Sequence, residues 1–104
     1  MNVQFKKGVL EMCVLVVVAG GDTYGYELAN KISQRFSIAE GTIYPLLRRL
    51  TQEGYFETYL AESSEGPPRK YYRLTDQGRS YVTEMIKEWQ AFSMSVNKMI
   101  EEGW

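Results

Sequence analysis

The spacing of apolar residues changes along the chain, and each change predicts a new element. Residues 5–19 are apolar on nearly every side, which is typical of a helix buried between neighbours. The glycines at 20–21 favour a helix end, because glycine readily adopts the left-handed conformation found there. A second helix is predicted over residues 24–35, where inward positions recur every four residues, at Leu28, Ile32 and Phe36.

A third helix is predicted over residues 41–53, with one apolar and one polar face. Pro45 indicates a start near Gly41, because proline is tolerated in the first turn of a helix but costs about 3 kcal/mol in its interior. The apolar face consists of Ile43, Leu46, Leu47 and Leu50. The opposite face and its flanks hold Gly41, Thr42, Tyr44, Pro45, Arg48 and Arg49. The apolar face can pack on the rest of the chain and leave the other face free for a partner.

Residues 55–74 predict a β-hairpin, after Gly54 ends the third helix. Residues 55–60 and 70–74 are rich in β-forming side chains. Residues 61–68 between them are polar, and we expect a mobile surface loop too long for a tight turn. The returning side of the hairpin begins with two cations, Arg69 and Lys70. A helix with a free basic face, followed by a hairpin with a basic edge, predicts a winged helix-turn-helix.

The last part of the chain, residues 75–104, predicts one long helix that Thr75 or Asp76 can cap. Its apolar residues alternate at spacings of three and four, at Val82, Met85, Trp89, Phe92, Val96 and Met99. This heptad spacing is typical of a coiled-coil seam. A small winged helix needs less helix than this, so we predict that the seam pairs with a second copy of the chain. The alternative is that the seam only completes the core of one chain.

Together these elements predict a mainly α fold with a small β-hairpin. Residues 1–74 are expected to form a winged helix-turn-helix, and residues 75–104 a dimerisation helix in the same compact unit. A length of 104 residues suits one such domain. The net charge of −1 gives no overall positive field, so a nucleic-acid site must be a local patch. Residues 31–79 supply a weak one, with eight Lys and Arg against six Asp and Glu.

The composition argues against an enzyme, a metal site and a membrane protein. The chain has no histidine, which removes the commonest general base and metal ligand, and we expect no cofactor. Its single cysteine, Cys13, excludes an internal disulfide and fits a reducing cytoplasm. The apolar run at residues 9–19 is interrupted by Glu11 and is too short to span a bilayer.

Helix-turn-helix geometry predicts how the third helix would meet DNA. The first residues of such a helix reach base edges, whereas its ends and flanks lie near phosphates. Gly41 permits close backbone approach, and Thr42 offers a hydroxyl and a methyl group. The longer side chains can bond phosphates or, for the arginines, read guanine: Tyr44, Arg48 and Arg49. The alternatives are an ordinary amphipathic helix with a solvated face and a winged helix that binds protein rather than DNA.

Three motifs in order resemble the PadR-type transcriptional regulators of the short form. They are YGYEL at residues 24–28, GTIYPLLRRL at 41–50 followed by Glu53-Gly54, and GPPRKYYRLT at 66–75 followed by Gly78. The resemblance implies a cytoplasmic homodimer that binds a pseudo-palindromic operator, usually as a repressor, and often releases it when a small molecule binds. It implies DNA contact by Tyr26, Thr42, Tyr44, Arg48, Arg69 and Lys70.

The chain departs from that family pattern just before the third helix. Ala39 and Glu40 stand where the family often has serine and proline. A carboxylate beside DNA is unfavourable unless it turns away or accepts a hydrogen bond from a cytosine amine. The residues at this end of the helix therefore leave the details of base reading open.

A further resemblance concerns the drug-sensing LmrR-like branch of the family. That branch places a tryptophan of its last helix in a pore between two subunits, and Trp89 stands at the matching position. With Phe92 and Met85 nearby, this resemblance implies an apolar slot for planar or cationic aromatic molecules, and so a multidrug sensor. The alternative is that Trp89 only fills the core of the dimer.

Overall fold

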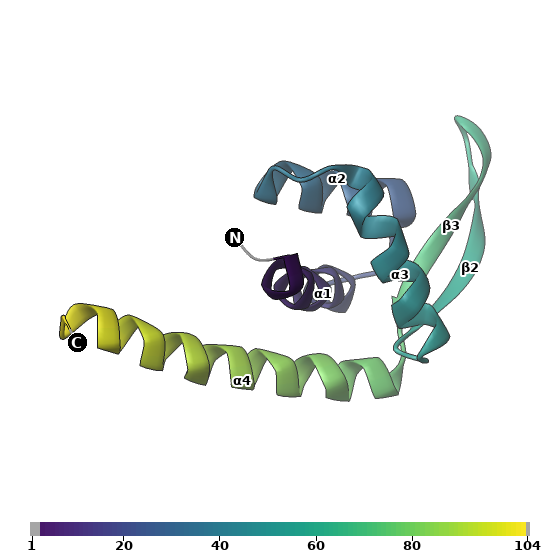
Figure 1. Cartoon of the computed structure of the whole chain (residues 1–104). Helices are drawn as coiled ribbons and strands as arrows, with labels where there is room; N and C mark the ends of the chain where they lie inside the picture. Colours follow the sequence, from purple (N-terminus) through teal and green to yellow (C-terminus); the bar gives the residue numbers. More distant parts are fainter. Residues whose placement is uncertain (1–2, 104) are drawn as a thin grey trace.

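Four helices and the base of a β-hairpin share one apolar core in the computed structural model, which describes residues 3–103 and the side chains of residues 7–103 (Figure 1). Helix α1 (Val3–Ala19) lies between α2 (Gly25–Phe36) and α4 (Asp76–Glu101). The buried side chains come from all of these elements and include Leu15, Val18, Leu28, Ala29, Ile32, Phe56, Leu74 and Val82. The predicted mainly α fold with a small hairpin is confirmed.

The third helix begins as its proline predicts. A short 3-10 turn (Glu40–Thr42) leads into α3 (Ile43–Gln52), so Pro45 lies in the first turn of the α-helix. All four residues of the predicted apolar face are at most 2% exposed: Ile43, Leu46, Leu47 and Leu50. In α2, by contrast, Phe36 was predicted to face inward but is 42% exposed, because it is the last residue of the helix.

A three-stranded antiparallel sheet takes the place of the predicted two-stranded hairpin. Strand β1 (Thr23–Tyr24) pairs with β3 (Gly66–Leu74), which also pairs with β2 (Phe56–Ser63). The prediction that a helix starts at residue 24 is therefore wrong by one residue, since Tyr24 belongs to a strand. A strand of two residues is too short to produce a pattern in the sequence.

The predicted long loop at residues 61–68 is also wrong. The strands continue almost to the tip of the hairpin, where Ser63 pairs with Gly66 and only two residues lie between them. Pro67 and Pro68 are accommodated because the pairing register shifts between Ala61 and Ser63, and prolines occur in sheets at such irregularities. The tip projects away from the helices (Figure 1).

Helix α4 begins against the turn that follows α3. The hydroxyl of Thr75 accepts a hydrogen bond from the Gly78 amide at 2.9 Å, which confirms the predicted cap. A Cβ at Gly78 would overlap the carbonyl oxygen of Tyr55 and lie 2.9 Å from Leu74 Cδ1, so only glycine fits at this contact. The start of α4 is thereby held closely against the domain.

The heptad seam of α4 divides between two environments. Val82, predicted to belong to the dimer seam, is 2% exposed and lies in the core of the single chain, which leaves it little surface for a partner. Met85 is half-buried against the same core. The remaining four seam residues are exposed: Trp89, Phe92, Val96 and Met99.

Candidate nucleic-acid interface

The outer face of α3 carries most of the side chains that the sequence predicts for DNA contact. The predicted residues that lie on this face and on the 3-10 turn before it are all exposed: Gly41, Thr42, Tyr44, Pro45 and Arg48. They point outward because the buried leucines on the other side of the helix dock it on the core. The helix therefore presents a short polar edge beside the hairpin.

The base of the hairpin adjoins this edge. Lys70 and Tyr72 of β3 line a pocket of about 210 Å³ together with four residues of α3, namely Tyr44, Arg48, Thr51 and Gln52. The Lys70 ammonium lies 5.8 Å from the centre of the Tyr72 ring. The cations of the helix and of the hairpin therefore share one surface.

A second pocket, of about 630 Å³, opens between the start of α2 and the same two elements. It is lined by Tyr24, Gly25, Tyr26, Tyr44, Arg69, Lys70 and Tyr72. A Cβ at Gly25 would lie 3.4 Å from Tyr72 Cε1, an ordinary contact distance, so α2 begins directly beside this tyrosine. The Arg69 guanidinium stacks 4.4 Å from the centre of the Tyr24 ring, and it also lies 3.6 Å from Glu65.

These two pockets define what we call the basic–aromatic surface, formed by Tyr26, Tyr44, Arg48, Arg69 and Lys70. Its three cations can neutralise an anion, and its phenol hydroxyls can donate hydrogen bonds to one. Burial raises the pKa of the neighbouring Tyr72. The Tyr72 hydroxyl therefore keeps its proton at neutral pH and can also donate a hydrogen bond. Sequence reasoning missed Tyr24 and Tyr72. The only available signal for them was their place in the motifs at residues 24–28 and 66–75.

Arg49 does not belong to this surface, although the sequence predicted a DNA contact there. Its guanidinium forms an ion pair with Glu11 of α1 and lies 3.3 Å from Glu53. The hydrogen bond to Glu11 raises the pKa of Arg49. Glu11 is 9% exposed, and its Oε1 has no hydrogen-bond partner among the described residues. The ion pair turns Arg49 toward α1, but its side chain is still 44% exposed, so a DNA contact by Arg49 stays a prediction.

An apolar groove lies at a distance from the basic–aromatic surface, between α1 and α4. It has a volume of about 510 Å³ and is lined by Gly8, Val9, Met12, Met85, Glu88, Trp89 and Phe92. Trp89 is 38% exposed and Phe92 is 61% exposed. The three residues expected for an effector slot, Met85, Trp89 and Phe92, thus line one groove.

Two other classes of site find no support in the part of the chain that is described. Within residues 3–103, no helix combines the length and the apolar character that crossing a membrane requires. The same residues contain no group of three or more acidic or cysteine side chains placed to hold a metal ion.

Comparison with known proteins places this geometry in a family. Residues 14–84 match the model of the Transcriptional regulator PadR-like family. The fold superposes on the crystal structure of a PadR-like transcriptional regulator from Bacillus cereus with a TM-score of 0.85 and 42% identity, covering 93% of this chain and 96% of that chain. The winged helix with a long C-terminal helix is thus confirmed.

Two curated proteins are also similar in sequence. A protein of Lysinibacillus sphaericus called Uncharacterized protein X is 35% identical over 99 residues, which cover 91% of each chain. The Negative transcriptional regulator PadR of Bacillus subtilis is 27% identical over 82 residues, which cover 75% of this chain and 45% of the relative. Both the family and the fold are those of transcriptional regulators rather than enzymes. The chain belongs to the PadR-like family of transcriptional regulators.

Proposed function

We propose that the protein is a cytoplasmic repressor that binds a pseudo-palindromic DNA operator as a homodimer. The observation that carries DNA binding is the basic–aromatic surface, which joins the outer face of α3 to the base of the hairpin. In this proposal, Thr42 at the start of α3 meets base edges, as recognition helices do. Arg48, Arg69 and Lys70 bind phosphates, and the hydroxyls of Tyr26 and Tyr44 donate to them.

The outer half of α4, residues 89–101, supports the homodimer. The exposed apolar side chains along its seam are Trp89, Phe92, Val96, Met99 and Ile100, with exposed fractions between 38% and 63%. Removing apolar surface from water stabilises an assembly by roughly 25 cal/mol per Å². A second copy supplies a matching apolar stripe through a twofold axis, and a twofold axis also provides the two recognition helices that an operator with two half-sites requires.

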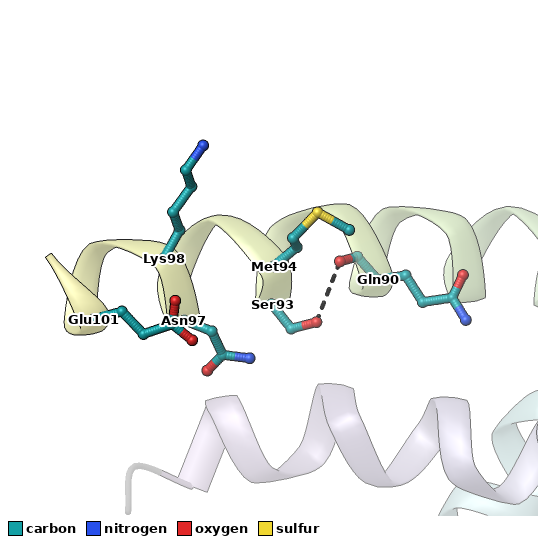
Figure 2. A pocket seen from close by; sticks show the side chains of 6 residues that line it. All are labelled: Gln90, Ser93, Met94, Asn97, Lys98 and Glu101. Atoms are coloured by element: carbon teal, nitrogen blue, oxygen red, sulfur yellow. Dashed lines mark hydrogen bonds between the residues drawn. The ribbon is translucent and has the colours of Figure 1, made fainter.

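The polar residues of α4 restrict which side of the helix can be buried. Figure 2 shows a stripe of residues projecting from α4 alone, and most of them are polar: Gln90, Ser93, Met94, Asn97, Lys98 and Glu101. This stripe runs beside the seam at the same spacings of three and four residues. The helix is therefore amphipathic, and we infer that the partner covers the seam and leaves the polar stripe in water.

Repression and effector release complete the proposal. Repression is supported by the similarity to a Bacillus subtilis protein named as a negative regulator. The apolar groove supports a planar aromatic effector, because Trp89 and Phe92 offer ring faces for stacking. The carboxylate of Glu88 at the same groove favours a cation. Such a ligand would make the protein a multidrug sensor.

A salt series on DNA binding tests the central part of this proposal. A duplex from upstream of the gene for this protein should be retarded, with an affinity that falls steeply as salt rises, because bound phosphates release counterions. Arg48→Ala and Arg69→Ala should each weaken binding without changing the thermal midpoint. Lys87→Ala is the control, since that lysine is 70% exposed on α4 and away from the basic–aromatic surface. Unchanged affinity in both arginine variants would contradict the proposal.

Fluorescence tests the effector. The chain has two tryptophans, so a Trp104→Phe background leaves Trp89 as the only emitter. We expect flat aromatic cations to quench this emission saturably and to lower DNA affinity in the same concentration range. A panel of such cations that neither quenches Trp89 nor changes DNA affinity would exclude the effector while leaving DNA binding intact.

A further inference from the structure

We propose that Glu40 reads a cytosine in each operator half-site, an inference that rests on the proposed DNA-binding function. Glu40 is the first residue of the 3-10 turn that leads into α3, directly before the exposed residues Gly41 and Thr42. A Cβ at Gly41 would meet no atom within 4 Å, so the space in front of this turn is open. In a helix-turn-helix, residues at this end of the second helix approach the base edges.

The carboxylate of Glu40 is held in place by the neighbouring helix. The side-chain amide of Asn30 in α2 donates a hydrogen bond of 3.0 Å to Oε1 of Glu40, and both residues are half-buried. The other oxygen, Oε2, accepts no hydrogen bond from the described residues. Asn30 therefore occupies one oxygen of the carboxylate and leaves the second for a partner outside the chain.

Glu40 has no cationic partner among the described residues, and the same is true of Glu27 and Glu62. Four other acids on or near the DNA-facing elements are ion-paired: Glu11, Glu53, Glu57 and Glu65. Within the described residues, no lysine or arginine lies within 4.0 Å of the Glu40 carboxylate. An uncompensated acid beside the cations of the basic–aromatic surface weakens phosphate binding. A contact between Oε2 and a donor of the DNA would offset this cost.

The major groove offers one donor that suits a single carboxylate oxygen. Cytosine presents its N4 amine alone, whereas guanine and the O4 of thymine present acceptors that repel a carboxylate. Adenine presents an amine beside an acceptor, N7, which matches an amide better than a carboxylate. Glu40 is therefore the specificity-determining residue, and Asn30 is the positioning residue that directs Oε2 toward the groove.

Selection of duplexes from a randomised library tests this assignment. We expect wild-type sites to carry cytosine at one position in each half-site. Glu40→Gln should shift that position toward adenine, because glutamine pairs with N6 and N7 of adenine. Glu40→Ala should lose the preference there, and neither variant should change the other positions. Replacing that cytosine by thymine should weaken wild-type binding on the order of tenfold and leave Glu40→Ala unaffected.

Asn30→Ala separates positioning from a structural role. We expect it to reduce the cytosine-to-thymine discrimination in binding, a readout that a loss of stability alone does not move. Its thermal midpoint, measured alongside, reports any structural effect. If both Glu40 variants select the wild-type sites, the inference is overturned, and Glu40 only tethers α3 to α2. If wild-type protein selects no duplex at all, the proposed DNA-binding function fails, and the inference fails with it.

Discussion

The inner half of α4, residues 76–88, and its outer half, residues 89–101, carry the same heptad spacing but meet different surroundings. Gly78 and Val82 of the inner half are buried, and Tyr81, Met85 and Ile86 pack against the core. In the outer half every residue is exposed except the half-buried Ser93. Heptad spacing therefore indicates which face of a helix is buried, but it does not indicate which surface covers that face.

The same substitution should unfold the protein in the inner half of α4 but only separate the dimer in the outer half. Val82→Asp places a carboxylate in the core and should remove several kcal/mol of stability, a large part of what a small domain has. Val96→Asp, at a position that is 42% exposed, should keep the fold and lose the dimer. Circular dichroism in urea and sedimentation measure the two effects. A folded Val82→Asp protein, or an unfolded Val96→Asp protein, would contradict the proposed difference between the two halves of α4.

The close contact at the start of α4 gives the next effect in size. Gly78→Ala should destabilise the protein by about 1–3 kcal/mol, because the added methyl group overlaps a backbone carbonyl that cannot move aside easily. This cost exceeds the gain of about 1 kcal/mol that alanine usually brings to a helix interior. Ser95→Ala in the exposed outer half is the control and should be neutral in urea denaturation. A stabilised Gly78→Ala protein would show that the contact is loose.

The two neighbouring arginines of α3 give a smaller, paired effect. Arg49→Gln should cost about 1–2 kcal/mol, because it leaves the buried Glu11 without its cation, although the half-exposed arginine limits the loss. Arg48→Gln should leave stability unchanged and weaken DNA binding. Urea denaturation measures the stability of both variants, and DNA retardation measures their affinity for DNA. If Arg49→Gln lost DNA affinity at unchanged stability, Arg49 would contact DNA rather than neutralise Glu11.

The smallest effect concerns Tyr81 of the inner half at alkaline pH. Burial raises the pKa of Tyr81 above its ordinary value of 10.0, and the nearby Glu11 and Tyr55 raise it further. Below about pH 10 the Tyr81 hydroxyl keeps its proton in both the folded and the unfolded protein, so its contribution to stability is fully present. As pH rises, the unfolded state loses its proton first, and stability falls until the folded pKa is passed. Tyr81→Phe should therefore lose less stability than wild type between pH 8 and 10.5, measured by urea midpoints. An equal loss in both would contradict the burial of this hydroxyl.

The parts of the fold that were predictable depend on local periodicity. The face of α3 formed by Ile43, Leu46, Leu47 and Leu50 follows from helical spacing alone. Pro45 restricts where that helix can begin, and Thr75 marks the start of α4 through its hydroxyl. Such features require knowledge only of residues within one or two turns.

The parts that were not predictable depend on contacts between distant residues. Arg49 meets Glu11, which is 38 residues away in a helix that looks wholly apolar around it. The hairpin tip depends on a register shift that brings Pro67 and Pro68 into the strand. Strand β1 forms because Thr23 pairs with Tyr72 of β3 and Tyr24 pairs with Tyr71. The pattern of a single segment contains none of these partners.

Sedimentation equilibrium of the wild-type chain at micromolar concentration tests the role of the outer half of α4 most directly. The chain has a mass of 12.0 kDa, and we expect a species of twice that mass for wild type. Val96→Asp should shift the mass to that of one folded chain and lower operator affinity. A wild-type protein that sediments as a single 12.0 kDa species under these conditions would show that the outer half of α4 does not bind a second copy.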